Sequence, residues 1–404
     1  MKGYAAVWRG EYAAALTDLD HALSKPLTRY WRGYALENRA YCYQQLQRNA
    51  DAIRDYSLAL RLLPGDGRTR AERGILYEQA GQKDLALDDF TEALRIDSSL
   101  ANAWFHRGSI YLQQRAYQQA RDDFREAIRC VPDDTRAYYE AGLASSYLGD
   151  LDSALSSFEV AIHLNPKHGH AYAGRGRIYR MKKEYEKALA DLDEAIRLIP
   201  HDTDPLLSRA LVYDDLGRYD EEIADLTEVI RLDPRNEKTL DWRGRSYRMK
   251  KDFAHATEDF TELIRITQAG GAYNERARTY FRSGQYALAL ADYQQAAAFP
   301  GGTVDSYVKP LAWLLATCPD PKFRDGDDAV ARATKDCERT QWHSSNEVDT
   351  LAAACAEAGK FEEAIRYEEQ AIALPGEEAA WEREMQERLA LYQKAQPYRE
   401  ELKK

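Results

Sequence analysis

The chain has 404 residues, of which 44% are hydrophobic and 11% aromatic, a composition typical of a folded protein rather than a disordered one. Its 56 Lys and Arg residues face 67 Asp and Glu residues, and the resulting net charge of −11 disfavours a general nucleic-acid-binding surface. No apolar run reaches the length of about 20 residues that a transmembrane helix needs. The five cysteines show no Cys-x-x-Cys spacing, which argues against a zinc ribbon and a dense disulfide framework.

The sequence repeats itself with a period of 34 residues. The string RGILY at 73–77 returns as RGSIY at 107–111, RGRIY at 175–179 and RGRSY at 243–247. Twelve residues after the small residue of each unit stands an alanine, with Glu222 as the exception, and an aromatic residue or Leu follows four residues later. A fixed period of this length is the signature of a repeat architecture.

Each unit predicts two helices joined by a short turn. In residues 103–114, Trp104, Arg107, Gly108 and Tyr111 share one helical face, and residues 85–96 repeat the helical period after the turn at 80–83. The small residues allow two backbones to approach closely, and the aromatic residues fill the space between adjacent pairs. Because one such hairpin cannot bury its apolar face alone, we expect neighbouring hairpins to stack.

This pattern resembles the tetratricopeptide repeat, as Gly74, Tyr77, Ala86, Phe90 and Ala93 illustrate within one unit. The resemblance covers residues 1 to about 300, and the strings at 311–326 and 388–400 resemble the closing module of large bacterial multi-repeat proteins. It implies an all-α fold, a right-handed α-solenoid of antiparallel helix pairs that ends in a C-terminal capping helix. It also implies a scaffold or adaptor that binds a protein or peptide partner.

The repeat register predicts four segments. Residues 1–300 form about nine helix hairpins, of which the first is truncated because Met1 falls at the sixth position of a repeat. Residues 301–341 predict an atypical helix pair with a long polar loop, and residues 342–376 predict a final repeat-like hairpin. Residues 377–404 predict a charged capping helix and tail.

Two charged positions vary together along the repeats. An arginine stands where the family usually has Leu, and an aspartate follows 16 residues later: Arg39 and Asp55, Arg73 and Asp89, Arg107 and Asp123, Arg175 and Asp191, Arg209 and Asp225, Arg243 and Asp259, Arg276 and Asp292. Where Ala141 or Leu351 replaces the arginine, the aspartate becomes Ser157 or Tyr367. We therefore expect a structural ion pair inside each hairpin, since stranding one buried member costs about 3–5 kcal/mol. The alternative is a series of anion-binding groups.

In the family, the concave groove is lined by a stripe of residues on the first helix of each repeat. The resemblance places here a candidate partner-binding set: Tyr139, Tyr147, His170, Arg177, Arg180, Met181, Asp214, Asp215, Arg245, Arg248, Met249, Arg278 and Arg282. The arginines of this stripe suit an acidic segment or a C-terminal carboxylate. The alternative is a neutral ladder in which Asp214 ties Arg180 to Arg248 and no ligand is involved.

No motif indicates catalysis, and we expect no cofactor and no metal. His163, His168 and His170 lie close in sequence, but no fourth ligand is in register with them. The acidic stretch at 320–328 lacks the spacing of a calcium loop. If Met1 is the natural start, the chain has no N-terminal signal peptide and a cytoplasmic location is expected; the alternative is a signal peptide that has been removed.

Three classes of function remain. The first is a non-enzymatic protein-binding scaffold, with an acidic partner segment at the basic groove of repeats six to nine. The second is a structural subunit or homo-oligomer that assembles through its ends, for example through Tyr4, Val7 and Trp8. The third, a binder of single-stranded nucleic acid, is the weakest because the groove arginines lack interleaved aromatic stacking platforms.

Overall fold

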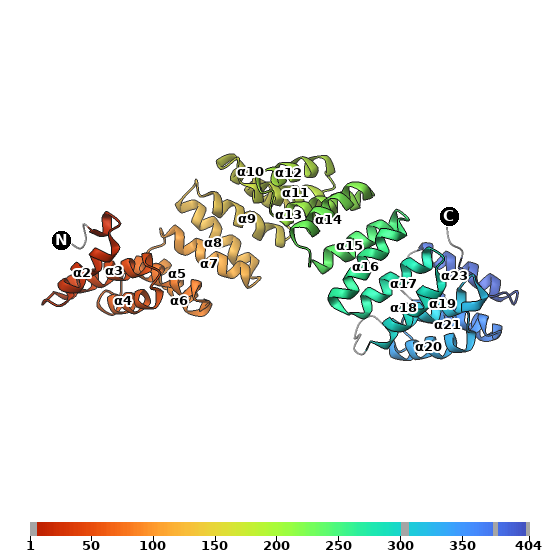
Figure 1. Cartoon of the computed structure of the whole chain (residues 1–404). Helices are drawn as coiled ribbons and strands as arrows, with labels where there is room; N and C mark the ends of the chain where they lie inside the picture. Colours follow the sequence, from red (N-terminus) through yellow and green to blue (C-terminus); the bar gives the residue numbers. More distant parts are fainter. Residues whose placement is uncertain (1–5, 300–306, 375–378, 401–404) are drawn as a thin grey trace. The chain divides into compact units, whose positions relative to one another are not determined.

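The computed structural model describes residues 6–299, 307–374 and 379–400, and all regular structure in these ranges is helical (Figure 1). The chain forms two compact units, Met1–Ser208 and Arg209–Lys404. Within each unit, helices that follow one another in sequence pack side by side. The fold is therefore an all-α solenoid of helix pairs, as the repeat predicts. None of the described helices is both long and apolar enough to cross a bilayer.

The helices follow the 34-residue register. The first unit contains α2 (Tyr12–Leu23), α3 (Arg29–Gln45), α4 (Asn49–Leu62), α5 (Gly67–Gln79), α6 (Lys83–Ile96), α7 (Ala101–Gln113), α8 (Tyr117–Cys130), α9 (Thr135–Tyr147), α10 (Leu151–Leu164), α11 (Gly169–Met181) and α12 (Tyr185–Leu198). Helix α13 (Thr203–Asp215) begins in the first unit and ends in the second. The second unit continues with α14 (Tyr219–Leu232), α15 (Glu237–Met249), α16 (Phe253–Thr267), α17 (Gly270–Arg282) and α18 (Tyr286–Ala298).

The core of most hairpins is built from a small residue, an alanine and an aromatic ring, and Leu192 and Leu226 take the place of the ring in two of them. Gly74 lies so close to Phe90 that a Cβ atom added to it would stand 2.8 Å from the ring, so no larger residue fits without movement. Ala86 and Phe90 are fully buried between the two helices. The same arrangement recurs at Gly142 and Gly244, which face Phe158 and Phe260. The close approach explains why the sequence places small residues at this position.

The turn inside each hairpin requires a residue with positive φ. Glycine supplies it in α5–α6, where Gly81 has a φ of +73°, and in α9–α10, where Gly149 has a φ of +76°. Alternate hairpins use a long polar residue instead: Gln47, Arg115, Lys183 and Lys251 adopt φ values of +58° to +62°. The turn geometry is therefore constant although its residue is not.

The C-terminal module consists of α19 (Val308–Thr317), a 3₁₀ turn η1 (Pro321–Phe323), α20 (Gly326–Arg339), α21 (Ser345–Glu357), α22 (Phe361–Ala373) and α23 (Ala379–Tyr392). Helix α23 lies in the segment for which we expect a charged capping helix, and it buries Met385, Arg388 and Tyr392 against the rest of the module. The reason is that Arg388 meets buried carboxyl groups, as described below. The predicted start of this helix at Glu377, the loop at 301–306 and Tyr4 lie outside the described residues.

Candidate functional site

Each predicted arginine lies within hydrogen-bond distance of its predicted aspartate. In every one of the seven hairpins, the Nε and Nη2 atoms of the arginine donate to the two carboxylate oxygens of the aspartate, at 2.6–3.0 Å. The aspartates are buried, and Asp55 is not exposed at all. Such two-point contacts have the geometry that a guanidinium group prefers.

The third donor of several of these arginines reaches the preceding repeat. Nη1 of Arg107 donates to the Thr91 hydroxyl at 3.2 Å, and Nη1 of Arg243 donates to the Thr227 hydroxyl at 3.0 Å. The hydrogen bond to Asp191 raises the pKa of the Arg175 guanidinium above its ordinary value. The guanidinium donors of these arginines are occupied by contacts within and between hairpins, so the geometry favours the structural interpretation over the anion-binding one.

In the first unit, the expected basic groove is largely neutralised. Arg177 forms an ion pair with Asp204, and Nδ1 of His170 lies 3.6 Å from Asp202. His168 is used locally, because its Nδ1 accepts a hydrogen bond from the Ala171 amide at the start of α11. Burial lowers the pKa of His168, and the neighbouring His170 lowers it further.

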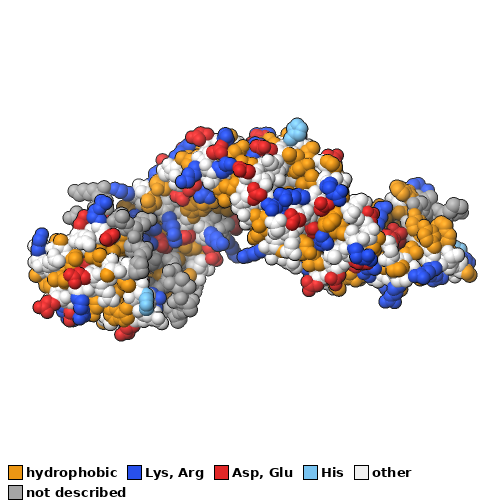
Figure 2. Space-filling model, turned by 180° about the vertical axis from the view of Figure 1, so that it is seen from behind, with side chains coloured by type: hydrophobic (Ala, Val, Ile, Leu, Met, Phe, Trp, Pro, Cys, Tyr) orange, Lys and Arg blue, Asp and Glu red, His pale blue; other side chains and the backbone are white. Residues whose placement is uncertain are grey.

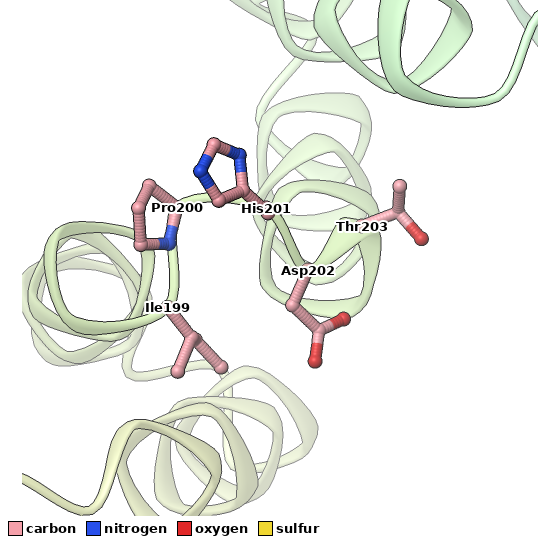
Figure 3. Close-up of a pocket in the computed structure, with 5 residues that line it drawn as sticks. All are labelled: Ile199, Pro200, His201, Asp202 and Thr203. Carbon is pink, nitrogen blue, oxygen red and sulfur yellow. The ribbon is translucent and has the colours of Figure 1, made fainter.

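Aromatic rings accompany these charged groups in the first unit. The Tyr139 ring lies 5.0 Å from the His168 ring, between centroids, and Tyr147 stacks on Tyr117 at 4.8 Å while remaining mostly exposed. A shallow hollow lies at the loop between α12 and α13, lined by Ile199–Thr203 (Figure 3). In this view Ile199 and Asp202 lie on one side of the loop and His201 on the other.

In the second unit, three arginines of α15 and α17 surround one carboxylate. Arg248 is 8% exposed and its Nη1 lies 2.7 Å from Oε2 of Glu275, which is also buried. Arg245 and Arg278 are half-exposed and lie 3.5 Å and 3.4 Å from Oε1 of the same carboxylate. Arg245 also contacts Asp241 at 3.1 Å, and Arg282 is exposed one turn beyond Arg278.

Charge and burial shift the pKa values of this cluster in opposite directions. Although burial tends to raise the pKa of Glu275, the charges of Arg248, Arg278 and Arg245 lower it below its ordinary value. Burial lowers the pKa of Arg248, which Glu275 partly offsets. The cluster is therefore a fixed carboxylate held by one buried arginine, with further guanidinium groups at its exposed rim.

These contacts correct two expectations. We expected Arg248 to be one of the groove residues that contact a partner, but Arg248 is buried and paired with Glu275. We also considered Asp214 as the link to Arg248, whereas the structure assigns that role to Glu275. Asp214 and Asp215 are exposed at the end of α13, and Met181 and Met249 are each more than half exposed. Arg180 and Asp215 have further contacts of their own.

A buried charge cluster in the C-terminal module escaped the sequence analysis. Nε of Arg388 on α23 donates to Asp349 at 2.8 Å and to Glu368 at 3.3 Å, and all three side chains are buried. The guanidinium group also lies 5.6 Å from the ring centroids of Trp313, Trp381 and Tyr398. Burial and the neighbouring Asp349 raise the pKa of Glu368 to about 10, so this carboxyl group is protonated at neutral pH.

Glu222 is a second buried carboxyl group without a functional assignment from sequence. It is fully buried where the other repeats have alanine, and its Oε1 accepts a hydrogen bond from the Ser246 hydroxyl at 2.6 Å. Burial raises its pKa above the ordinary value. The departure from alanine was the only signal that the sequence offered.

No described group of three or more His, Cys, Asp or Glu side chains is placed to hold a metal ion. On the face that Figure 2 shows, side chains of both charge signs are interspersed. In the part of the chain that the structure describes, the exposed arginines on the groove stripe of the second unit are thus Arg245, Arg278 and Arg282.

Comparison with known proteins gives the following matches. Family models described as tetratricopeptide repeat match residues 72–135, 139–203, 204–236 and 270–298. No curated relative matches the chain.

Solved structures also resemble the chain. YrrB, described as a TPR protein with an unusual peptide-binding site, is 21% identical over 46% of this chain and 95% of its own, with a TM-score of 0.41. The C-terminal part of a TPR repeat-containing protein from Cytophaga hutchinsonii is 21% identical over 59% of this chain and 97% of its own, with a TM-score of 0.47. MamA is 24% identical over 40% of this chain and 94% of its own, with a TM-score of 0.38.

Proposed function

Since this chain is a multi-repeat tetratricopeptide-repeat protein, we propose that it is a non-enzymatic scaffold that binds an acidic segment of a partner protein at the arginine cluster of α15 and α17. The family supports a protein-interaction scaffold in general. The acidic character of the partner is the finer part of the proposal, and it rests on the arginine geometry of the second unit.

The observation that carries the proposal is the unequal pairing of three arginines with Glu275. Arg248 is paired with Glu275 at 2.7 Å and is buried, so it organises the cluster and does not reach a partner. Arg245 and Arg278 lie at the longer distances of 3.5 Å and 3.4 Å from Glu275, and about half of each side chain is exposed. Their remaining donors are available to carboxylate groups, which guanidinium groups bind in a two-point geometry.

Glu275 gives this cluster its shape. A guanidinium side chain loses conformational freedom when it binds a ligand, and a fixed carboxylate that already restrains the arginine reduces that loss. Arg282 adds a fourth positive charge one turn along α17. Four arginines around Glu275 and Asp241 leave an excess of positive charge in a protein whose net charge is −11, and this excess favours an acidic ligand.

The proposal is tested with a fluorescein-labelled polyglutamate peptide in fluorescence anisotropy. The triple variant Arg245→Gln, Arg278→Gln and Arg282→Gln should weaken binding by at least about tenfold, and salt should weaken wild-type binding. A matched control replaces Arg129, Arg197 and Arg231 with Gln, because these arginines are exposed and paired with glutamates at other helix ends. Equal binding by the two triple variants contradicts the proposal.

A second set of measurements separates the proposed ligand from nucleic acid. A single-stranded oligonucleotide should not compete with the peptide, since the cluster offers no interleaved aromatic rings for base stacking. Effective competition by the oligonucleotide would point to nucleic acid instead of an acidic protein segment. Arg248 is unsuitable as a test position because its loss would strand the buried Glu275.

Assembly through the N-terminal edge is a second candidate function. Trp8 is 77% exposed, which favours a contact with another surface at this edge. A concentration-independent oligomer in light scattering that the Trp8→Ser variant abolishes would support this candidate. A monomer at all concentrations would exclude assembly and leave the scaffold as the remaining candidate function.

A further inference from the structure

The tip formed by the ends of α2 and α4 and the start of α3 differs from the equivalent tip of every other repeat. Helix α3 has 17 residues, whereas the first helices of the later repeats, α5 to α17, have 13 each. Gly33 corresponds in the repeat register to Gly67, where α5 begins, so residues 29–32 form an extra turn. At 1.5 Å per residue this turn extends the helix by about 6 Å.

The extra turn is held in place by its own arginines. Nε of Arg29 donates to the Leu62 carbonyl at the end of α4, at 2.7 Å. Nη2 of Arg32 lies 3.4 Å from the carbonyls of Leu23 and Lys25, at the end of α2 and in the loop that follows. Carbonyls at helix C-termini lack intrahelical donors, so these contacts satisfy them and attach the turn to both neighbouring helices. Figure 1 shows α2, α3 and α4 at the N-terminal end of the chain.

The turn presents aromatic rings to solvent. Tyr30 and Trp31 are 58% and 57% exposed, and their ring centroids lie 5.4 Å apart. Tyr34 packs against both, stacked on Tyr30 at 6.4 Å and edge-on to Trp31 at 6.2 Å. These mutual contacts form a fixed aromatic ridge. Leu58 on α4 is also exposed, where the later repeats have mostly glutamate.

The same tip is positively charged and lacks carboxylates. The second helices of five other repeats end in an arginine that is paired with a glutamate three residues earlier, as Arg95 is with Glu92. At the end of α4 this glutamate is Leu58, and Arg61 forms no ion pair with any described residue. Residues 24–36 and 58–65 contain no Asp or Glu. The adjacent carboxylate, Asp66, is occupied by the amide and hydroxyl of Thr69.

We propose that this tip is a peripheral membrane-contact surface that binds anionic lipid headgroups. Trp and Tyr rings lie preferentially at the headgroup level of a bilayer, because one part of each ring is apolar and another part is polar. Lys25, Arg29, Arg32 and Arg61 supply the positive charge that attracts anionic lipids. A projecting turn with rings and cations fits a flat surface, and the helices that form it, α2–α4, carry none of the groove arginines of α15 and α17.

Vesicle co-sedimentation of the full chain tests the proposal. Wild-type protein should bind vesicles of phosphatidylcholine mixed with phosphatidylglycerol and should not bind vesicles of phosphatidylcholine alone. The variant Lys25→Glu with Arg61→Glu should reduce binding at least about 25-fold, since each cation near an anionic surface contributes about fivefold. Neither side chain forms an ion pair within the described residues, so the variant should fold normally, which circular dichroism checks.

Two further variants decide what kind of contact the tip makes. Tyr30→Ser with Trp31→Ser should reduce vesicle binding by roughly tenfold, because the rings no longer enter the headgroup layer. The control Lys167→Glu with Arg235→Glu makes the same charge change at exposed positions elsewhere and should bind as wild type does.

Several results would overturn the proposal. These are no binding of wild type to the anionic vesicles, equal losses in the control and the Lys25/Arg61 variant, and full binding without the two rings. Binding of an oligonucleotide or of an acidic protein at this tip, without vesicle binding, would assign it to that partner instead.

Discussion

The regular hairpins and the C-terminal module both pair an arginine with buried carboxyl groups, but they do so differently. In α7 and α8, Arg107 and Asp123 lie 16 residues apart and form a one-to-one pair inside one hairpin. In the C-terminal module, Arg388 comes from α23 and meets Asp349 on α21 and Glu368 on α22. The first arrangement is local and repeated, whereas the second joins three helices at one point.

The difference reflects which helices each arginine joins. A hairpin in the middle of the array has neighbours on both sides, so its arginine needs only to join its own two helices and to touch the preceding repeat. The hairpin of α21 and α22 has Leu351 and Tyr367 in place of the pair. Helix α23 packs against this hairpin and places the charged Arg388 next to its buried carboxyl groups. The C-terminal arginine thus attaches the capping helix to the hairpin it covers.

The largest effect is expected from Arg388→Met. The substitution leaves the buried Asp349 without its cation and Glu368 without a hydrogen-bond donor, and we expect the module to lose about 3–5 kcal/mol of stability at neutral pH. Hydrogen exchange of α21–α23, compared with that of α5–α12, should show the loss in the C-terminal module first. Glu368→Gln is the matched variant and should cost less than about 1 kcal/mol, because this carboxyl group is already protonated. Equal losses in both variants would contradict the assigned protonation state.

The next effect concerns the regular pair. Arg107→Ala should lower stability by about 2–4 kcal/mol, because Asp123 is 5% exposed and would be left without its partner. The double variant Arg107→Leu with Asp123→Tyr copies the residues of the last hairpin and should be more stable than the single variant. Urea unfolding of both variants measures the difference. A less stable double variant would show that the two positions do not act as a pair.

The smallest expected effect is a pH dependence in the first unit. Burial, together with Asp66 and Glu72, raises the pKa of Glu37 to about 7. A carboxyl group whose pKa is raised in the folded state favours folding below its unfolded pKa, and this contribution disappears as the pH rises through about 7. Glu37→Gln should therefore be more stable than wild type by about 1–2 kcal/mol at pH 8, and the difference should vanish at pH 4. Thermal melts across this range measure it; a constant difference would exclude titration of Glu37 as its cause.

The repeats, the hairpins and the seven arginine–aspartate pairs could be predicted because each follows from a spacing that recurs. A helix pair of 34 residues puts residues 16 apart on facing helices, and a change at one of the two positions accompanies a change at the other, as at Ala141 and Ser157. The Arg388 cluster could not be predicted, since its members are 39 and 20 residues apart and occur once.

The candidate groove also has one property that could be predicted from the sequence and one that could not. Its stripe of arginines could be identified from the repeat register, but their pairing could not. Arg245 and Arg248 are one helical turn apart and look alike in sequence, yet Arg248 is buried against Glu275 and Arg245 is half-exposed.

By itself, the sequence determined that this protein is a stack of helix hairpins and which residues face one another inside a hairpin, because those contacts are local and periodic. The tertiary structure decided which charged side chains remain available to a ligand. Availability depends on burial and on partners from other helices, such as Glu275 for Arg248 and Asp204 for Arg177, and neither follows from a spacing along the chain.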